Sequence, residues 1–113
     1  MKKVIPSLRE KKRYLVFEVI SRNRITREHI MGTVKSAYMS FLGQLEAGKA
    51  GIMVLGECYD EDRQRGIIKV GHAYLDRLRA SLALARQSGG EPIIIRSLLA
   101  TGILGKAKDC LRR

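Results

Sequence analysis

The fold of this chain is decided in residues 63–86, which read RQRGIIKVGHAYLDRLRASLALAR. Within them, Gly66 and Gly71 bracket a short β-branched run, which predicts a strand. A helical period begins directly after this run, since the apolar residues now recur every three or four positions. The members of this apolar helix face are Leu75, Leu78, Leu82 and Ala85. Because Gly89-Gly90 is typical of a helix end, the stretch predicts a strand that leads into a helix packed back over a sheet.

The residues before this stretch predict a strand, a long helix and a second strand. Residues 14–20, YLVFEVI, are rich in β-branched and aromatic side chains, as strands are. Thr26 suits the N-cap of an amphipathic helix of about five turns, with Gly48 as its expected end. Residues 51–55 form the next apolar run, and the polar residues 59–64 predict a hairpin connection to the strand that follows.

The residues after this stretch predict one more strand and a short helix. Residues 91–99 contain consecutive apolar side chains, which favours a strand buried on both faces. Residues 102–113 are interpreted as a basic C-terminal helix. The order β-α-β-β-α-β plus a terminal helix predicts an α+β fold, a ferredoxin-like or RRM-like αβ sandwich. We expect an antiparallel sheet in the strand order 4-1-3-2, with both long helices on one face.

The apolar side chains of these elements predict a core between the sheet and the two long helices. We expect it to contain Phe17, Ile30, Val34, Phe41, Leu78, Leu82 and Ile94. The other face of the sheet also carries apolar residues. We therefore expect the terminal helix, the N-terminal arm or a partner to cover part of that face.

Net charge is the main indication of function. The chain has 113 residues, which fits one domain over residues 1–113. Its 22 Lys and Arg outnumber its 11 Asp and Glu, for a formal net charge of +11, so a polyanion is the natural partner. The charged surface of a thermophile is the alternative, but such a surface would be rich in both signs of charge.

The positive charges form three groups that the predicted sheet brings together. One is a basic N-terminal arm, residues 1–12, which leads into the first strand; one lies on the third strand, and one on the terminal helix. The order 4-1-3-2 places the first strand between the other two, so we expect a single RNA-binding surface that acts on phosphates. Its predicted members are Lys2, Lys3, Arg9, Lys11, Lys12, Arg13, Arg65, Lys69, Lys106, Lys108, Arg112 and Arg113.

Base stacking on the sheet is the alternative way to bind RNA. It requires aromatic side chains on the first and third strands. Tyr14 is the only candidate on the first strand, and the third strand offers Ile67, Ile68 and Val70 instead of aromatics. Phosphate contacts with folded RNA therefore fit this composition better.

No catalytic constellation or metal-binding motif stands out. The three acids at residues 60–62 could suggest Mg²⁺, but acids in a turn are more typical of a solvated loop, and their spacing does not match a calcium loop. Cys58 and Cys110 lack metal-ligand spacing, and although they could form one disulfide, nothing indicates an oxidising compartment. No apolar run is long enough to span a membrane and no signal-peptide core is present, so we expect a cytoplasmic protein that does not bind membranes.

Several segments, in order along nearly the whole chain, resemble the ribonuclease P protein component 2 family. The segments are 7–14 (SLREKKRY), 65–70 (RGIIKV), 79–84 (RASLAL) and 95–98 (IRSL), followed by Thr101-Gly102. The resemblance implies an RRM-like subunit of an endoribonuclease that removes the 5′ leader from precursor tRNA. It also implies that the RNA subunit carries out the chemistry with its own Mg²⁺, and that this protein has no catalytic residues and binds no cofactor.

The resemblance implies partners as well. They are the ribonuclease P RNA, precursor tRNA within the holoenzyme, and ribonuclease P protein component 3; a homodimer within a heterotetramer is compatible with it. Two other functions stay open on the residues alone. A stand-alone RNA-binding module or RNA chaperone would need no protein partner, and a regulatory ferredoxin-like domain would need an effector pocket but no such charge.

Overall fold

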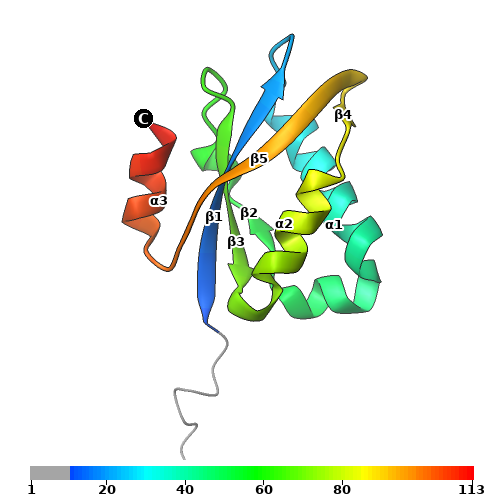
Figure 1. Cartoon of the computed structure of the whole chain (residues 1–113), viewed down its shortest axis with the longest axis vertical. Helices are drawn as coiled ribbons and strands as arrows, with labels where there is room; N and C mark the ends of the chain where they lie inside the picture. The colour runs from blue at the N-terminus through cyan, green and yellow to red at the C-terminus, as the bar shows by residue number, and fades with distance from the viewer. Residues whose placement is uncertain (1–10) are drawn as a thin grey trace, which may run out of the picture.

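Residues 11–113, which the computed structural model describes, form a five-stranded antiparallel sheet with helices on both faces (Figure 1). The segment 1–10, with most of the predicted N-terminal arm, lies outside the described residues. The strands are β1 (Lys12–Ser21), β2 (Met53–Val54), β3 (Arg65–Gly71), β4 (Gln87–Ser88) and β5 (Glu91–Thr101), and the α-helices are α1 (Arg27–Ala50), α2 (Leu75–Ala83) and α3 (Leu104–Leu111).

The sheet has the predicted topology with one added strand. Its order is β2-β3-β1-β5-β4, so the four strands expected from the sequence lie in the order 4-1-3-2. The added strand β4 exists because α2 ends at Ala83, before Gly89-Gly90. These two glycines have φ of +58° and +80° and form the tight turn between β4 and β5, not the end of the helix. The α+β, RRM-like prediction is confirmed.

Helix α1 begins as predicted but ends later and bends. The Oγ1 of Thr26 accepts a hydrogen bond from the backbone N–H of His29 at 3.4 Å, which caps the N-terminus. The helix breaks at Gly43, where φ is +80°, and it ends at Gly51 in the left-handed region, three residues beyond the expected Gly48. Because of the break, α1 turns a corner, and its second part runs in a different direction (Figure 1).

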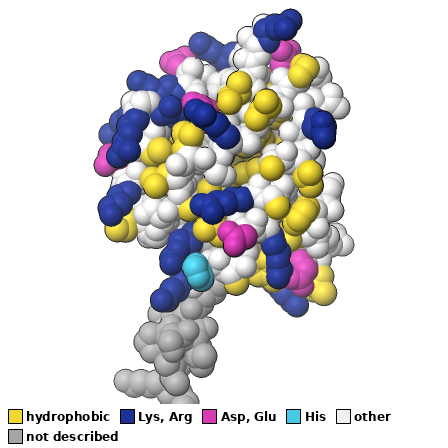
Figure 2. Space-filling view, in the orientation of Figure 1, with side chains coloured by type: hydrophobic (Ala, Val, Ile, Leu, Met, Phe, Trp, Pro, Cys, Tyr) yellow, Lys and Arg dark blue, Asp and Glu magenta, His cyan; other side chains and the backbone are white. Residues whose placement is uncertain are grey.

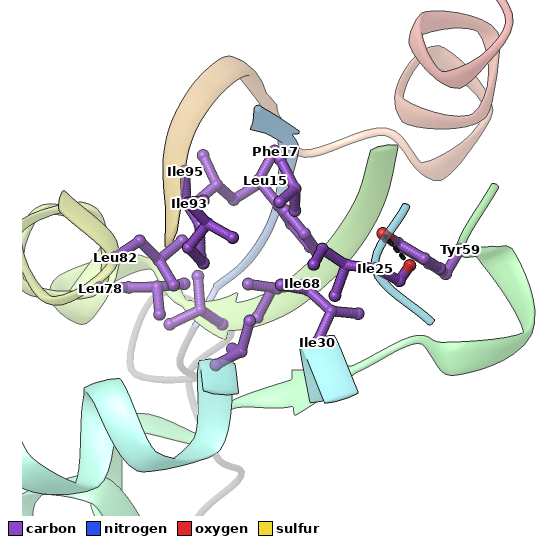
Figure 3. Packing of buried hydrophobic residues seen from close by; sticks show 13 residues of the cluster. Leu15, Phe17, Ile25, Ile30, Tyr59, Ile68, Leu78, Leu82, Ile93 and Ile95 are labelled. Atoms are coloured by element: carbon purple, nitrogen blue, oxygen red, sulfur yellow. Dashed lines mark hydrogen bonds between the residues drawn. The ribbon is translucent and has the colours of Figure 1, made fainter. Parts of the chain in front are cut away.

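The main core lies between the sheet and the helices α1 and α2 (Figure 3). Five of the seven side chains predicted to be buried are at most 1% exposed; they are Phe17, Ile30, Val34, Leu78 and Leu82. Two predictions are wrong. Phe41 is 44% exposed, because it lies next to the break at Gly43 and lines an open groove between α1 and α2. Ile94 is 63% exposed, because β5 alternates and buries Ile93 and Ile95 in its place.

A second, smaller core lies on the opposite face of the sheet, under α3. The side chains of Val16 and Ile67 point away from α1 and α2 and pack with Ala107, Cys110 and Leu111 of α3. In the described part of the chain, the terminal helix thus covers part of this face. None of the helices within residues 11–113 is both long and apolar enough to cross a bilayer.

Candidate nucleic-acid interface

The α3 side of the sheet is where the described positive groups meet. On this face Tyr14 of β1 is aligned with Lys69 of β3 on one side and with Thr101 of β5 on the other. Lys12 is two residues from Tyr14 and therefore belongs to the same face of the strand. The start of β1, the end of β3 and the approach to α3 thus converge at one end of the sheet.

The N-terminal group reaches the start of the α3 segment. Lys11 and Lys12 are exposed, and the backbone carbonyl of Lys11 accepts a hydrogen bond of 2.6 Å from the N–H of His72. The guanidinium of Arg13 donates to the carbonyl of Lys12 at 3.1 Å and lies beside Gly102, where an added Cβ would be 3.3 Å from Nη1. The start of β1 is therefore in contact with the segment that leads into α3.

The C-terminal group lies on the outer surface of α3. The helix buries Ala107, Cys110 and Leu111 against the sheet, so the residues between them point outward. The outward basic residues, all of them exposed, are Lys106, Lys108, Arg112 and Arg113. Figure 2 shows Lys and Arg side chains gathered over the α3 side of the molecule, with others near the start of β1.

Arg65 is a predicted member whose side chain is largely buried and engaged within the fold. It is 18% exposed, and its Nε lies 3.1 Å from Oε2 of Glu18. Its Nη1 donates to the carbonyl of Cys110 at 3.1 Å and also to the carbonyl of Arg113. Arg65 therefore fastens the C-terminal end of α3 to the sheet, where a positive charge also complements the helix dipole. An RNA contact by Arg65 stays a prediction.

Glu18 is the carboxylate that organises this attachment. It is 16% exposed, and Oε1 accepts a second bond, of 2.8 Å, from Nε of Arg96. Burial raises the pKa of Glu18, but the hydrogen bonds and charges of Arg65 and Arg96 outweigh it, so the pKa lies below its ordinary value of 4.5. Sequence reasoning missed this cluster. The available signal was one acid in the otherwise apolar segment 14–20.

The predicted site residues thus fall into three classes. Lys2, Lys3 and Arg9 lie outside the described residues. Arg65 holds α3. Two of the other members share the face of the sheet that α3 covers, Lys12 and Lys69. Four lie on α3 or at its end, Lys106, Lys108, Arg112 and Arg113, and two lie at the start of β1, Lys11 and Arg13.

The same face offers little for base stacking or metal binding. Tyr14 is only partly exposed and packs against the second core. Among residues 11–113, no three His, Cys, Asp or Glu side chains gather in a way that could hold a metal ion. Cys58 and Cys110 are both free thiols. Exposed cations are therefore the main groups on this surface that could bind a ligand.

Comparisons with known proteins agree with this picture. The model of the Rpp14/Pop5 family matches residues 13–112. The chain is 36% identical to ribonuclease P protein component 2 of Methanosarcina mazei over 109 residues, which cover 96% of this chain and 90% of the relative. It is 32% identical to the protein of the same name from Pyrococcus abyssi over 108 residues, with the same shares covered.

A solved structure supports the fold. A chain in the cryo-EM structure of yeast ribonuclease MRP matches with a TM-score of 0.65 at 16% identity, over 98% of this chain and 90% of that chain. With the family model and these relatives spanning nearly all of the sequence, the chain belongs to the Rpp14/Pop5 family.

Proposed function

We propose that this chain is a protein subunit of ribonuclease P, the endoribonuclease that removes the 5′ leader from precursor tRNA. The observation that carries the proposal is the family membership, together with relatives named ribonuclease P protein component 2 over 96% of the chain. The charge supports it independently, since a net charge of +11 suits a protein that works on a large RNA.

The basic surface on the α3 side is the part of the molecule that we assign to the RNA. Phosphates crowded in a folded RNA repel one another, and Lys and Arg side chains offset that repulsion without reading bases. Exposed cations at the start of β1 and on α3, together with the partly exposed Lys69 of β3, lie on the sheet or on a helix packed against it, so they can neutralise several phosphates at fixed positions. The protein would in this way stabilise the active fold of the RNA.

In this proposal the chemistry is not carried out by the protein. The RNA subunit would bind the Mg²⁺ ions and cleave the phosphodiester bond, and the protein would bind no cofactor. The protein partner would be ribonuclease P protein component 3, and a homodimer within a heterotetramer is compatible with this role. The assembly would act in the cytoplasm.

Reconstitution of precursor-tRNA cleavage tests the proposal. We expect the full chain to raise the cleavage rate of the RNA subunit in the presence of component 3, and to cleave nothing by itself. Changing Lys106, Lys108 and Arg112 to alanine should lower the rate by about tenfold or more at physiological salt. The matched control changes Lys35, Lys49 and Arg79, which are exposed on the helix layer, and should have little effect.

Two results would contradict the proposal. One is cleavage of precursor tRNA by the purified protein without the RNA subunit. The other is a reconstituted enzyme whose rate does not depend on this protein, which would favour a stand-alone RNA-binding module.

A further inference from the structure

Among residues 11–113, strand β5 has an outer edge that is mostly unpaired. One side of β5 pairs with β1 from Ile93 to Thr101, whereas on the other side β4 pairs only with Glu91 and Pro92. Within residues 11–113, no strand adjoins β5 on that side between Ile94 and Thr101. Figure 1 shows β4 beside only one end of the long strand. An unpaired row of peptide groups is a template for a strand from another chain.

The hydrogen-bond pattern shows which peptide groups point outward. The N–H of Ile93 donates to the carbonyl of Arg86, on the side away from β1, at 2.9 Å. Since peptide groups alternate along a strand, the N–H groups of Ile95 and Ser97 point the same way. The pairing with β1 leads to the same orientation. Val19 of β1 is aligned with Ile95, and the N–H of Val19 donates to the carbonyl of Gln64, on the side away from β5.

The charges around this edge select the kind of partner. Arg86 is exposed and bonded to β5 through its carbonyl, Arg96 is 58% exposed within β5, and Arg22 lies beside Glu91 and Pro92. The nearby acids are already engaged. Asn23 donates to the Glu91 carboxylate at 3.2 Å, and Glu18 is held by two arginines. Among the described residues around this edge the arginines outnumber the acids, so the edge has a net positive charge next to open backbone groups.

We propose that the outer edge of β5 binds an extended acidic segment of a protein partner as an added strand. Backbone hydrogen bonds would supply the affinity, and the arginines would select carboxylate side chains. Ile94, which is 63% exposed, would contact an apolar residue of the same segment. A second copy of this chain fits less well, because it would bring the same arginines together on two molecules that each carry +11. This inference does not depend on the proposed ribonuclease P function.

Amide hydrogen exchange on the full chain tests the proposal directly. The probe is an octapeptide of alternating Glu and Val residues, and the matched controls are the same peptide with N-methylated alternate residues and its Lys-for-Glu version. In the free protein, the amides of Ile95 and Ser97 should exchange faster than those of Ile94 and Arg96, which face β1. The acidic peptide should slow the exchange of Ile95 and Ser97 by about tenfold or more, and neither control should do so.

Two variants add a second readout in a peptide-binding titration. Ser97→Pro removes an outward N–H at an exposed position and should weaken binding by about tenfold or more, whereas Ser97→Val keeps the N–H and should bind as the wild type does. The N-methylated peptide keeps the test decisive if Ser97→Pro does not fold. Equal binding of the acidic peptide and its N-methylated version would overturn the proposal. Protection of Ile95 and Ser97 by an RNA oligonucleotide, or by raised protein concentration alone, would overturn it in favour of RNA or of a second copy.

Discussion

Arg65→Ala should detach the end of α3 from the sheet at a measurable cost in stability. The guanidinium makes one ion pair with Glu18 and hydrogen bonds to two carbonyls at the end of α3. Hydrogen bonds to charged groups contribute about 1.5–3 kcal/mol each when buried, but both side chains here are 16–18% exposed and Arg96 continues to compensate Glu18. We therefore expect a loss of about 2–3 kcal/mol in the free energy of unfolding.

Urea unfolding with a matched control measures this effect. Arg96 binds the same carboxylate but is 58% exposed, so Arg96→Ala should cost about 1 kcal/mol or less. Thiol alkylation reports on α3 itself. Cys110 is only 7% exposed under the helix, and Arg65→Ala should accelerate its alkylation while that of the partly exposed Cys58 stays unchanged. Equal losses for the two arginine variants, with no change at Cys110, would refute the attachment by Arg65.

Three further predictions concern the core, a tight contact and pH. Leu82→Ala should cost about 2–5 kcal/mol in urea unfolding, whereas Ile94→Ala, at a 63% exposed position, should cost under about 1 kcal/mol; equal losses would mean that α2 is packed differently. Gly66→Ala would place a Cβ 2.7 Å from Cζ of the buried Phe17 and should cost about 1–3 kcal/mol, whereas Gly105→Ala meets nothing within 4 Å and should be neutral or slightly stabilising. The pKa of Glu18 is lowered in the folded state, so the stability that its ionised carboxylate contributes is present above pH 4.5 and is lost as the pH falls below that value. The difference in the free energy of unfolding between wild type and Glu18→Gln should therefore shrink in acid. A difference that stays constant with pH would mean that Glu18 is not engaged.

Local patterns in the sequence predicted most of the fold. The β-branched and aromatic content of residues 14–20, the cap at Thr26 and the helical period after Gly71 are each local features of the sequence, and the strand and helices that they predict are present in the structure. Together they specify the order of strands, since right-handed crossovers leave few topologies for such a chain.

The two incorrect predictions of burial have different causes. Phe41 has the spacing of a buried helix residue, but it lies two residues before the break at Gly43 and lines the open groove between α1 and α2. Ile94 lies in a run of three isoleucines and points to the α3 side of the sheet, so it would be buried only if another element packed on it there. The eight residues of α3 cover Val16 and Ile67 and leave Ile94 exposed.

The candidate site was only partly predictable from the sequence. Charge in the sequence identified the three basic groups, because composition needs no knowledge of contacts. That Arg65 would be engaged with Glu18 and α3 could not be foreseen, because Glu18, Arg65 and Arg113 are far apart in the sequence and meet only in the folded sheet.

An RNA-binding titration across salt shows whether this protein binds RNA through the cations at the start of β1 and around α3. Three proteins are compared with the ribonuclease P RNA as ligand: wild type, the triple reversal of Lys11, Lys12 and Arg13 to glutamate, and Tyr14→Ala. We expect the wild-type log K to fall linearly with log salt, and the reversal to weaken binding and lower the slope by about 2 units, at roughly 0.7–0.9 per phosphate. Tyr14→Ala should keep both affinity and slope. Unchanged affinity and slope for the reversal, together with loss of binding in Tyr14→Ala, would contradict the account and indicate base stacking on the sheet.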